Sequence, residues 1–187
     1  GDEQFRWLQR RLEAGSSRFF DVWGAEQKRQ VDDELFVLFS HHTSESMNNL
    51  LLDPGKPEIR HGGLEVVNTL KRFPNVIAWV NGHTHVNSIT ARRHRDPERS
   101  FWEINTASHV DFPQLARIIE VADNRDGTIS LFTPLIEAAS PATANPSDLS
   151  AKGLASLYRE LAYNDIHRDD DLLGVAADRN CELLLTH

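Results

Sequence analysis

The stretch VIAWVNGHTH, residues 76–85, sets an apolar run directly before two histidines. The run from Val76 to Val80 is short, continuous and rich in β-branched residues, which is typical of a strand buried on both faces. In an extended segment, residues two apart point to the same side, so His83 and His85 are expected to project together. Gly82 is expected to let the backbone turn tightly beside them. The stretch therefore predicts a buried strand with two imidazoles at its carboxyl end.

A second apolar run, ELFVLFSHH at residues 34–42, follows the same design. Leu35 to Phe39 is again predicted to be a strand buried on both faces, and it leads into His41 and His42. Four of the nine histidines thus follow two predicted strands. Open α/β sheets place their binding sites at the carboxyl ends of the strands, and imidazole is the commonest metal ligand. The sequence therefore favours a metal site over separate structural histidines.

The rest of the chain alternates helical and extended patterns at first and then becomes a run of strands. The expected helices cover residues 3–14, 64–73 and 149–163. The further expected strands cover residues 86–91, 100–105, 114–121 and 128–135. Asp2 is expected to cap the first helix, and Ser147 or Asp148 the last. The pattern predicts an α/β fold of the α+β sandwich type, in which a mixed sheet carries flanking helices. Residues 43–63, which include Asp53-Pro54-Gly55, are expected to form a long loop.

Composition narrows the class of protein. Of the residues, 40% are hydrophobic and 26% are charged, as in ordinary globular domains. The net charge of −8 argues against a general basic surface for nucleic acid, whereas a phosphate substrate stays compatible because bound metal ions supply positive charge. Cys181 is the only cysteine, which excludes an intrachain disulfide and a thiolate zinc site, and it is expected to be a small buried residue. No apolar run approaches the roughly 20 residues of a transmembrane helix, and the compartment is left open.

Several motifs together resemble one family. Gly82-His83-Thr84-His85 after one apolar strand and Ser40-His41-His42 after an earlier one resemble the C-terminal half of the calcineurin-like metallophosphoesterases. The segments EQFRWLQRRL, FWEINTASHVDFPQLARIIEV and DGTISLFT resemble that family's helix and terminal strand pair, in the same order. The resemblance covers residues 1–138. Residues 139–187 form a linker and an expected helical extension packing on that portion, and this tail resembles a bacterial subfamily.

The resemblance implies a hydrolase that cleaves phosphate mono- or diesters with two divalent metal ions, Mn, Fe or Zn, and a hydroxide that bridges them. It implies that His41 and His83 bind one ion and that His85 binds the other. His42 would lie beside the ions or the substrate, as a catalytic residue that binds no metal. The family's earlier motifs, Asp-x-His, Gly-Asp-x-x-Asp and Gly-Asn-His-Asp/Glu, are not present in the expected order. The chain is therefore expected to be the C-terminal portion of a longer enzyme, to bind at most one ion weakly and to be inactive alone.

The histidines at the strand ends have two other interpretations. A metallo-β-lactamase-type zinc hydrolase continues His-x-His with x-Asp-His, but Asn87 and Ser88 stand at the last two positions, which excludes it. A non-catalytic α/β module that binds a partner, with structural histidines, stays open. A sheet that lacks its first strands would expose an edge and apolar surface, so we expect either the missing N-terminal half or self-association to cover it.

The remaining histidines and a basic segment carry less weight. His61, His94 and His109 are expected to be loop residues. The segment ARRHRDPER, residues 91–99, holds four arginines, and it is expected to be a solvated hairpin end. Contact between these arginines and an anionic substrate or partner is the second interpretation.

Overall fold

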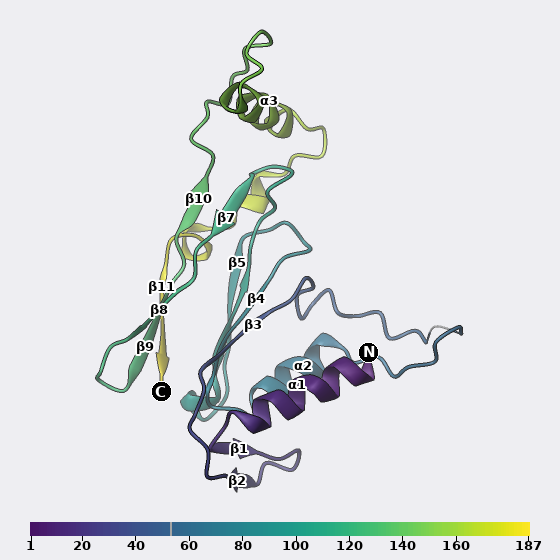
Figure 1. Cartoon of the computed structure of the whole chain (residues 1–187), viewed down its shortest axis with the longest axis vertical. Coiled ribbons are helices and arrows are strands. Elements are labelled where there is room, and N and C mark those ends of the chain that lie inside the picture. The colour runs from purple at the N-terminus through teal and green to yellow at the C-terminus, as the bar shows by residue number, and fades with distance from the viewer. Residues whose placement is uncertain (53) are drawn as a thin grey trace.

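The buried run becomes β4 (Val76–Asn81), an inner strand of a four-stranded sheet in the computed structural model, which describes residues 1–52 and 54–187 (Figure 1). Its neighbours β3 (Phe36–Phe39) and β6 (Phe101–Asn105) run parallel to it, and β5 (Ser88–Arg92) pairs antiparallel with β6. Every residue of β4 is buried, as predicted. The sheet is mixed, and the chain has the expected α+β fold.

Two helices cover one face of this sheet, α1 (Asp2–Ala14) and α2 (Gly63–Leu70) (Figure 1). The buried core on this side consists of Phe5, Leu12, Val66, Val67, Leu70, Phe73, Val76, Trp79 and Phe101. Gly1 rather than Asp2 is the N-cap of α1, and Asp2 instead pairs with Arg6 in the first turn. Leu64, which lies at helical spacing with Val67 and Leu70, is nevertheless 73% exposed. The helix turns Val66, Val67 and Leu70 inward instead.

A second, antiparallel sheet covers the other face. It contains β8 (Glu120–Asp123), β9 (Thr128–Phe132) and β11 (Glu182–Thr186), in the order β11–β9–β8. The buried core between the two sheets consists of Ile77, Ala78, Val80, Ile104, Ile129, Leu131, Leu183 and Leu185. The molecule thus has a layer of helices, a mixed sheet and an antiparallel sheet, and the histidine-bearing strands lie in the middle layer.

The two predicted strands at residues 114–121 and 128–135 each divide in two. The first becomes β7 (Leu115–Arg117) and β8, and the second becomes β9 and β10 (Leu135–Glu137). β7 and β10 pair with each other in a separate two-stranded sheet. Pro134 lies between β9 and β10, and it has no N–H to donate to a strand ladder. Both predictions of a single strand were therefore wrong.

The remaining short elements lie in the loops. A hairpin of β1 (Arg18–Phe20) and β2 (Glu26–Lys28) follows α1, and the 3-10 helix η1 (Pro97–Arg99) precedes β6. Residues 43–52 and 54–62 form the predicted long loop without helix or strand, and Asp53 of the expected Asp53-Pro54-Gly55 turn lies outside the described residues.

The C-terminal tail first leaves the body of the molecule and then returns to it (Figure 1). It contains α3 (Ala151–Tyr163), the 3-10 helices η2 (Asp170–Leu173) and η3 (Ala176–Asp178), and finally β11. Ser150 caps α3 by accepting from the Gly153 N–H, so the predicted caps Ser147 and Asp148 were wrong. The expected helical extension thus ends in a strand paired with β9. Cys181, expected to be buried, is only half-buried.

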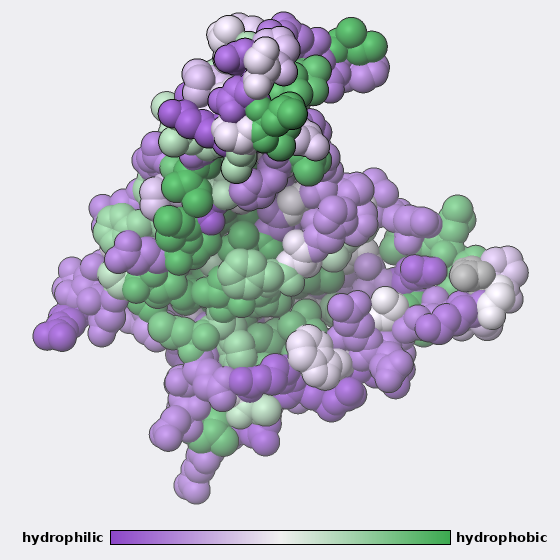
Figure 2. All heavy atoms as spheres, turned by 45° about the horizontal axis from the view of Figure 1, so that its top comes forward, coloured by the Kyte–Doolittle hydropathy of each residue, from purple (hydrophilic) through white to green (hydrophobic). Residues whose placement is uncertain are grey.

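β3 is an edge strand, and the prediction that both its faces are buried was wrong, because none of its four residues is fully buried. Phe39 is 72% exposed, and among the described residues β3 pairs only with β4. A groove of about 510 Å³ runs between α1 and β3, and its apolar lining includes Trp7, Leu8 and Phe36. Figure 2 shows hydrophobic side chains gathered in the middle of the face below α3. Coverage of this edge by a further chain segment or by self-association stays a prediction.

Asn75 joins three segments just before β4. Its Nδ2 donates to the carbonyl oxygens of Gly15 (2.9 Å) and Glu34 (2.8 Å), and its Oδ1 accepts from the Ser16 hydroxyl at 2.9 Å. The side chain is buried, so its loss would leave several polar groups without partners. Asn75→Ala is expected to lower the free energy of unfolding by about 2–3 kcal/mol in urea denaturation. Asn68→Ala, at an exposed position of α2, is the control and should change it by less than about 0.5 kcal/mol.

Candidate metal centre

The turn after β3 is fixed to the end of β4 by main-chain hydrogen bonds. The Ser40 N–H donates to the Val80 carbonyl at 3.1 Å, and the Gly82 N–H donates to the His41 carbonyl at 3.0 Å. The Ser40 hydroxyl donates to the His42 carbonyl at 2.8 Å and accepts from the indole N–H of the buried Trp79, also at 2.8 Å. The backbone that carries the two adjacent histidines is therefore held by the core rather than by loop contacts alone.

The segment after β4 is not extended. His83 and His85 have φ values of 71° and 59°, in the left-handed region that residues other than glycine adopt at a cost in free energy. The prediction that the two side chains project together was wrong because it assumed a continuing strand. Gly82 does not have a positive φ, and an added Cβ would meet only atoms at 3.9 Å. The tight turn is therefore made by the histidines themselves, and such strained residues cluster at functional sites.

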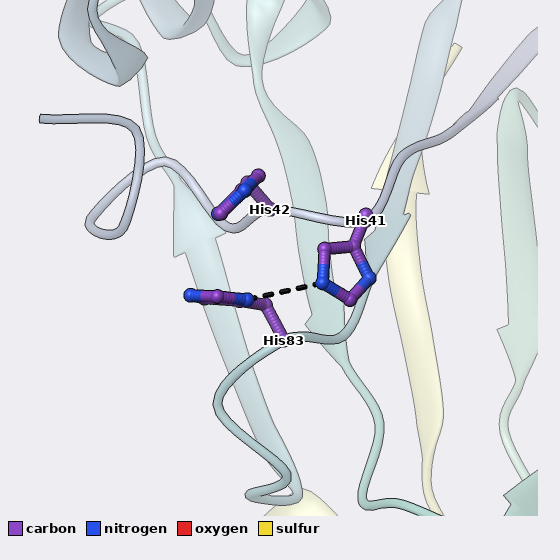
Figure 3. A group of neighbouring side chains, drawn as sticks. All are labelled: His41, His42 and His83. Carbon is purple, nitrogen blue, oxygen red and sulfur yellow. Dashed lines mark hydrogen bonds between the residues drawn. The ribbon is translucent and has the colours of Figure 1, made fainter. Parts of the chain in front are cut away.

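Three imidazoles come together at the carboxyl ends of β3 and β4 (Figure 3). One ring nitrogen from each of His41, His42 and His83 lies within 4.8 Å of the others. The His41 Nε2 and His83 Nδ1 are 3.0 Å apart, and the ring centroids of His42 and His83 are 4.0 Å apart. A tetrahedral zinc ion with bonds of about 2.0–2.1 Å places its ligand nitrogens about 3.3 Å from one another. The nitrogens of the three residues thus lie near the spacing of metal ligands, and the group could hold one metal ion.

His85 lies outside this group. Its Nδ1 is 2.5 Å from the Asp111 Oδ2, across 26 residues of sequence. Asp111 comes from the loop after β6, and it was missed in the sequence, where the nearby His109 was weighed instead. His42 is the third member of the group, although the family resemblance implies that it lies beside the ions without binding them. No Asp or Glu joins the three imidazoles within the ranges 1–52 and 54–187.

The three-histidine group is open to solvent and rich in potential positive charge. His41 and His83 are exposed, and His42 is half-buried. The pKa of His83 is lowered from its ordinary value, first because neighbouring atoms displace water from the ring, and then because of the charges on His42, His41 and His85. A lowered pKa keeps the imidazole neutral to a lower pH, so protons compete less with a metal ion for its nitrogen.

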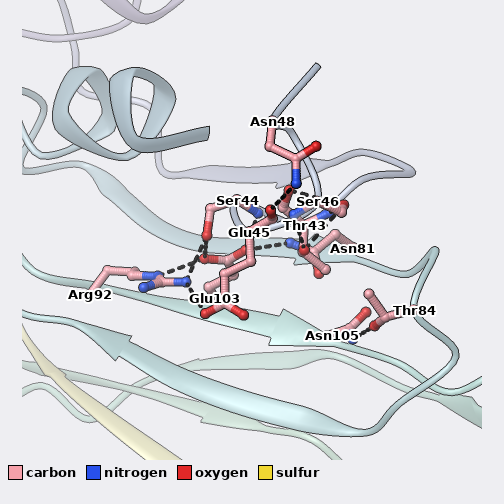
Figure 4. Close-up of polar contacts among 10 residues, drawn as sticks. All are labelled: Thr43, Ser44, Glu45, Ser46, Asn48, Asn81, Thr84, Arg92, Glu103 and Asn105. Atoms are coloured by element: carbon pink, nitrogen blue, oxygen red, sulfur yellow. Dashed lines mark hydrogen bonds and ion pairs between the residues drawn. The ribbon is translucent and has the colours of Figure 1, made fainter. Parts of the chain in front are cut away.

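A buried carboxylate anchors the histidine-bearing turn to the sheet (Figure 4). Glu103 of β6 is only 4% exposed and accepts from the Ser44 N–H and hydroxyl, both at 2.8 Å. It also accepts from the Asn81 Nδ2 at 2.9 Å and the Arg92 Nε at 2.6 Å. Because Ser44 is two residues from His42, Glu103 determines where the turn lies over the sheet. This contact joins residues 59 apart and has no signature in the sequence.

The other histidines have different environments. His61, expected to be a loop residue, is half-buried between α1 and α2, stacks on Phe5 and lies 3.0 Å from the Asp2 carboxylate. His109 is exposed, as expected. Neither reaches the three-histidine group.

The comparisons with known proteins identify no relative. No family model matches the chain, and no curated protein matches its sequence. The metallophosphoesterase interpretation therefore depends on the motifs and on the site geometry. None of the helices formed by residues 1–52 and 54–187 has the length and apolarity that crossing a bilayer requires.

Proposed function

We propose that this chain supplies the histidine side of the metal centre of a phosphoesterase that cleaves phosphate mono- or diesters. The observation that carries the proposal is the convergence of His41, His42 and His83 at the carboxyl ends of two parallel strands. Three imidazoles are a sufficient protein ligand set for a catalytic zinc ion, which keeps a fourth position for water or substrate. When bound, the ion would polarise a phosphoryl oxygen and lower the pKa of water at that position.

The residues of the chain have separate roles in this proposal. His41 and His83 present exposed imidazoles that serve no packing function, which favours ligation over the alternative of a partner-binding module with structural histidines. His42 is held by the Ser46 hydroxyl, 3.2 Å from its Nδ1, and Glu103 fixes the same turn. The open position of the group leaves room for a phosphate ester.

The His85–Asp111 pair supports a second metal-binding position, two residues after His83. A carboxylate next to one imidazole nitrogen orients the ring and leaves the other nitrogen available, which is the usual arrangement behind a metal-binding histidine. The 2.5 Å contact at Nδ1 therefore directs His85 to bind through Nε2. His85 would hold the second ion of the proposed two-metal centre, as the one imidazole that the described part of the chain contributes to it.

Metal and phosphate binding test the function together. The chain, freed of metal and then titrated with Zn²⁺ or Mn²⁺ in a calorimeter, is expected to bind one ion. Adding inorganic phosphate, the product of monoester cleavage, should then show binding in addition to any binding by the metal-free chain, because the ion attracts phosphoryl oxygens. The metal-dependent part should disappear in the His42→Ala/His83→Ala double variant.

Two results would count against the proposal. If the chain bound metal but showed no metal-dependent binding of phosphate, the metal site would be supported and the phosphoesterase function would be contradicted. If the double variant bound metal as the wild type does, the assignment of His42 and His83 as ligands would be contradicted. The chain alone is expected to show little turnover of bis(4-nitrophenyl) phosphate, and rapid turnover would contradict the expectation that further ligands are required.

A further inference from the structure

A cluster of basic side chains lies toward the opposite end of the central sheet from the histidines. A groove of about 890 Å³ runs along α2 from Gly62 to Arg72, beside the β1–β2 hairpin and the segment before β6. Its basic lining residues are Lys71, Arg72, His94, Arg95 and Arg99. These side chains precede the amino ends of β4 and β6, whereas the histidines follow the carboxyl ends. His41, His42 and His83 are not among the residues that line the groove.

The positive charge of this groove is not neutralised. Within the described part of the chain, no carboxylate forms an ion pair with Lys71, Arg72, Arg95 or Arg99. Arg18 and Arg92, which lie nearby in the fold, are paired with Glu98 and Glu103. An unpaired cationic cluster is notable in a chain whose net charge is −8.

The acidic residues near the groove have other partners. Asp21 accepts from the N–H groups of Trp23 and Ala25, each at 2.9 Å, and Glu65 lies 2.9 Å from the His61 Nδ1. Asp96 acts on Arg99 through its charge without forming an ion pair. The carboxylates around the groove thus leave its cations available to a ligand.

Arg72 and Arg99 are held in place, and Lys71 and Arg99 are partly removed from water. The Arg72 Nε donates to the Phe20 carbonyl at 2.7 Å, and the Arg99 Nε donates to the Lys71 carbonyl at 2.8 Å. The Arg99 guanidinium lies 4.0 Å from the centre of the Phe20 ring. Burial lowers the pKa of Lys71 and of Arg99, because their charged forms lose hydration. An anion would restore the lost stabilisation without having to order these side chains first.

We propose that this groove binds the phosphate group of a phosphorylated organic molecule. Guanidinium forks and a lysine are the side chains that match phosphate oxygens. Trp23 and Leu64 also line the groove and are 89% and 73% exposed, so an apolar surface lies beside the charges for the organic part of the ligand. The proposal does not depend on the proposed phosphoesterase function.

The test uses the whole chain, freed of metal on a chelating resin, and inorganic pyrophosphate as the probe. Lys71→Gln/Arg95→Gln removes two charges whose side chains make no hydrogen bond in the described structure, so the fold should be kept. We expect calorimetry to show pyrophosphate binding that is about 100-fold weaker in this variant, about tenfold for each charged contact. Arg93→Gln/Arg125→Gln makes the same change in net charge outside the groove and should bind as the wild type does.

The outcomes distinguish a lipid headgroup from a free phosphate compound as the ligand, and they test the groove separately from the metal centre. Binding of phosphatidylglycerol vesicles that the Lys71→Gln/Arg95→Gln variant loses would support the phosphate site and assign a lipid headgroup to it. Pyrophosphate binding that His83→Gly retains shows that the groove acts independently of the metal centre. The proposal is overturned if neither probe binds, or if the groove variant and the Arg93→Gln/Arg125→Gln control bind equally.

Discussion

His83→Gly is expected to weaken Zn²⁺ binding about 100-fold while raising the melting temperature of the metal-free chain. Zinc affinity falls because one of three imidazoles is lost. The melting temperature rises because glycine adopts the φ of 71° without the steric cost that a Cβ imposes. Zinc affinity is measured by competition with a chromophoric chelator, and melting by circular dichroism.

Two further variants separate the ligand from the strain. His83→Ala removes the imidazole but keeps a Cβ at a positive φ, so it should lose zinc binding without the gain in melting temperature. His109→Ala removes an exposed histidine outside the group and should leave both quantities unchanged. If His83→Gly bound zinc as the wild type does, His83 would not be a ligand. A melting temperature below that of His83→Ala would mean that the left-handed conformation stores no strain.

Glu103→Ala is expected to lower the free energy of unfolding by about 3–5 kcal/mol. The substitution leaves the Arg92 guanidinium, the Asn81 amide and the Ser44 N–H without their shared acceptor in a buried place. Glu103→Gln is expected to destabilise as well, because all the contacts of the carboxylate are with donors and a glutamine amide would set its own donor against one of them. Urea denaturation measures both changes.

The control for this network lies on the same turn. Glu45 is 3.7 Å from the Arg92 Nη2, but its side chain is 85% exposed, so Glu45→Ala should change stability by less than about 0.5 kcal/mol. Because Glu103 also positions the turn after β3, Glu103→Gln should weaken zinc binding even in conditions where the chain stays folded. Equal stability of Glu103→Gln and Glu45→Ala would show that the buried carboxylate does not anchor the turn.

Local patterns in the sequence predicted the inner strand β4, the helix α1 and the presence of histidines at two adjacent strand ends. These features follow from apolar periodicity, which acts over a few residues. The same reasoning was wrong for β3, because an apolar run indicates burial but does not show how completely other elements cover the two faces of the strand. It was also wrong for the strand at residues 114–121, which divides at Ile118, and for the strand at residues 128–135, which divides at Pro134.

The membership of the histidine group was decided by the tertiary structure. Sequence spacing paired His83 with His85, but both residues have a left-handed backbone, and His83 joins His41 and His42 whereas His85 lies beside Asp111. Asp111 reaches His85 across 26 residues, and Glu103 reaches Ser44 across 59. The sequence by itself determined which imidazoles are present at the strand ends. Only the packed chain decided which of them meet, because backbone dihedrals in a turn and contacts between distant segments are set by the whole fold.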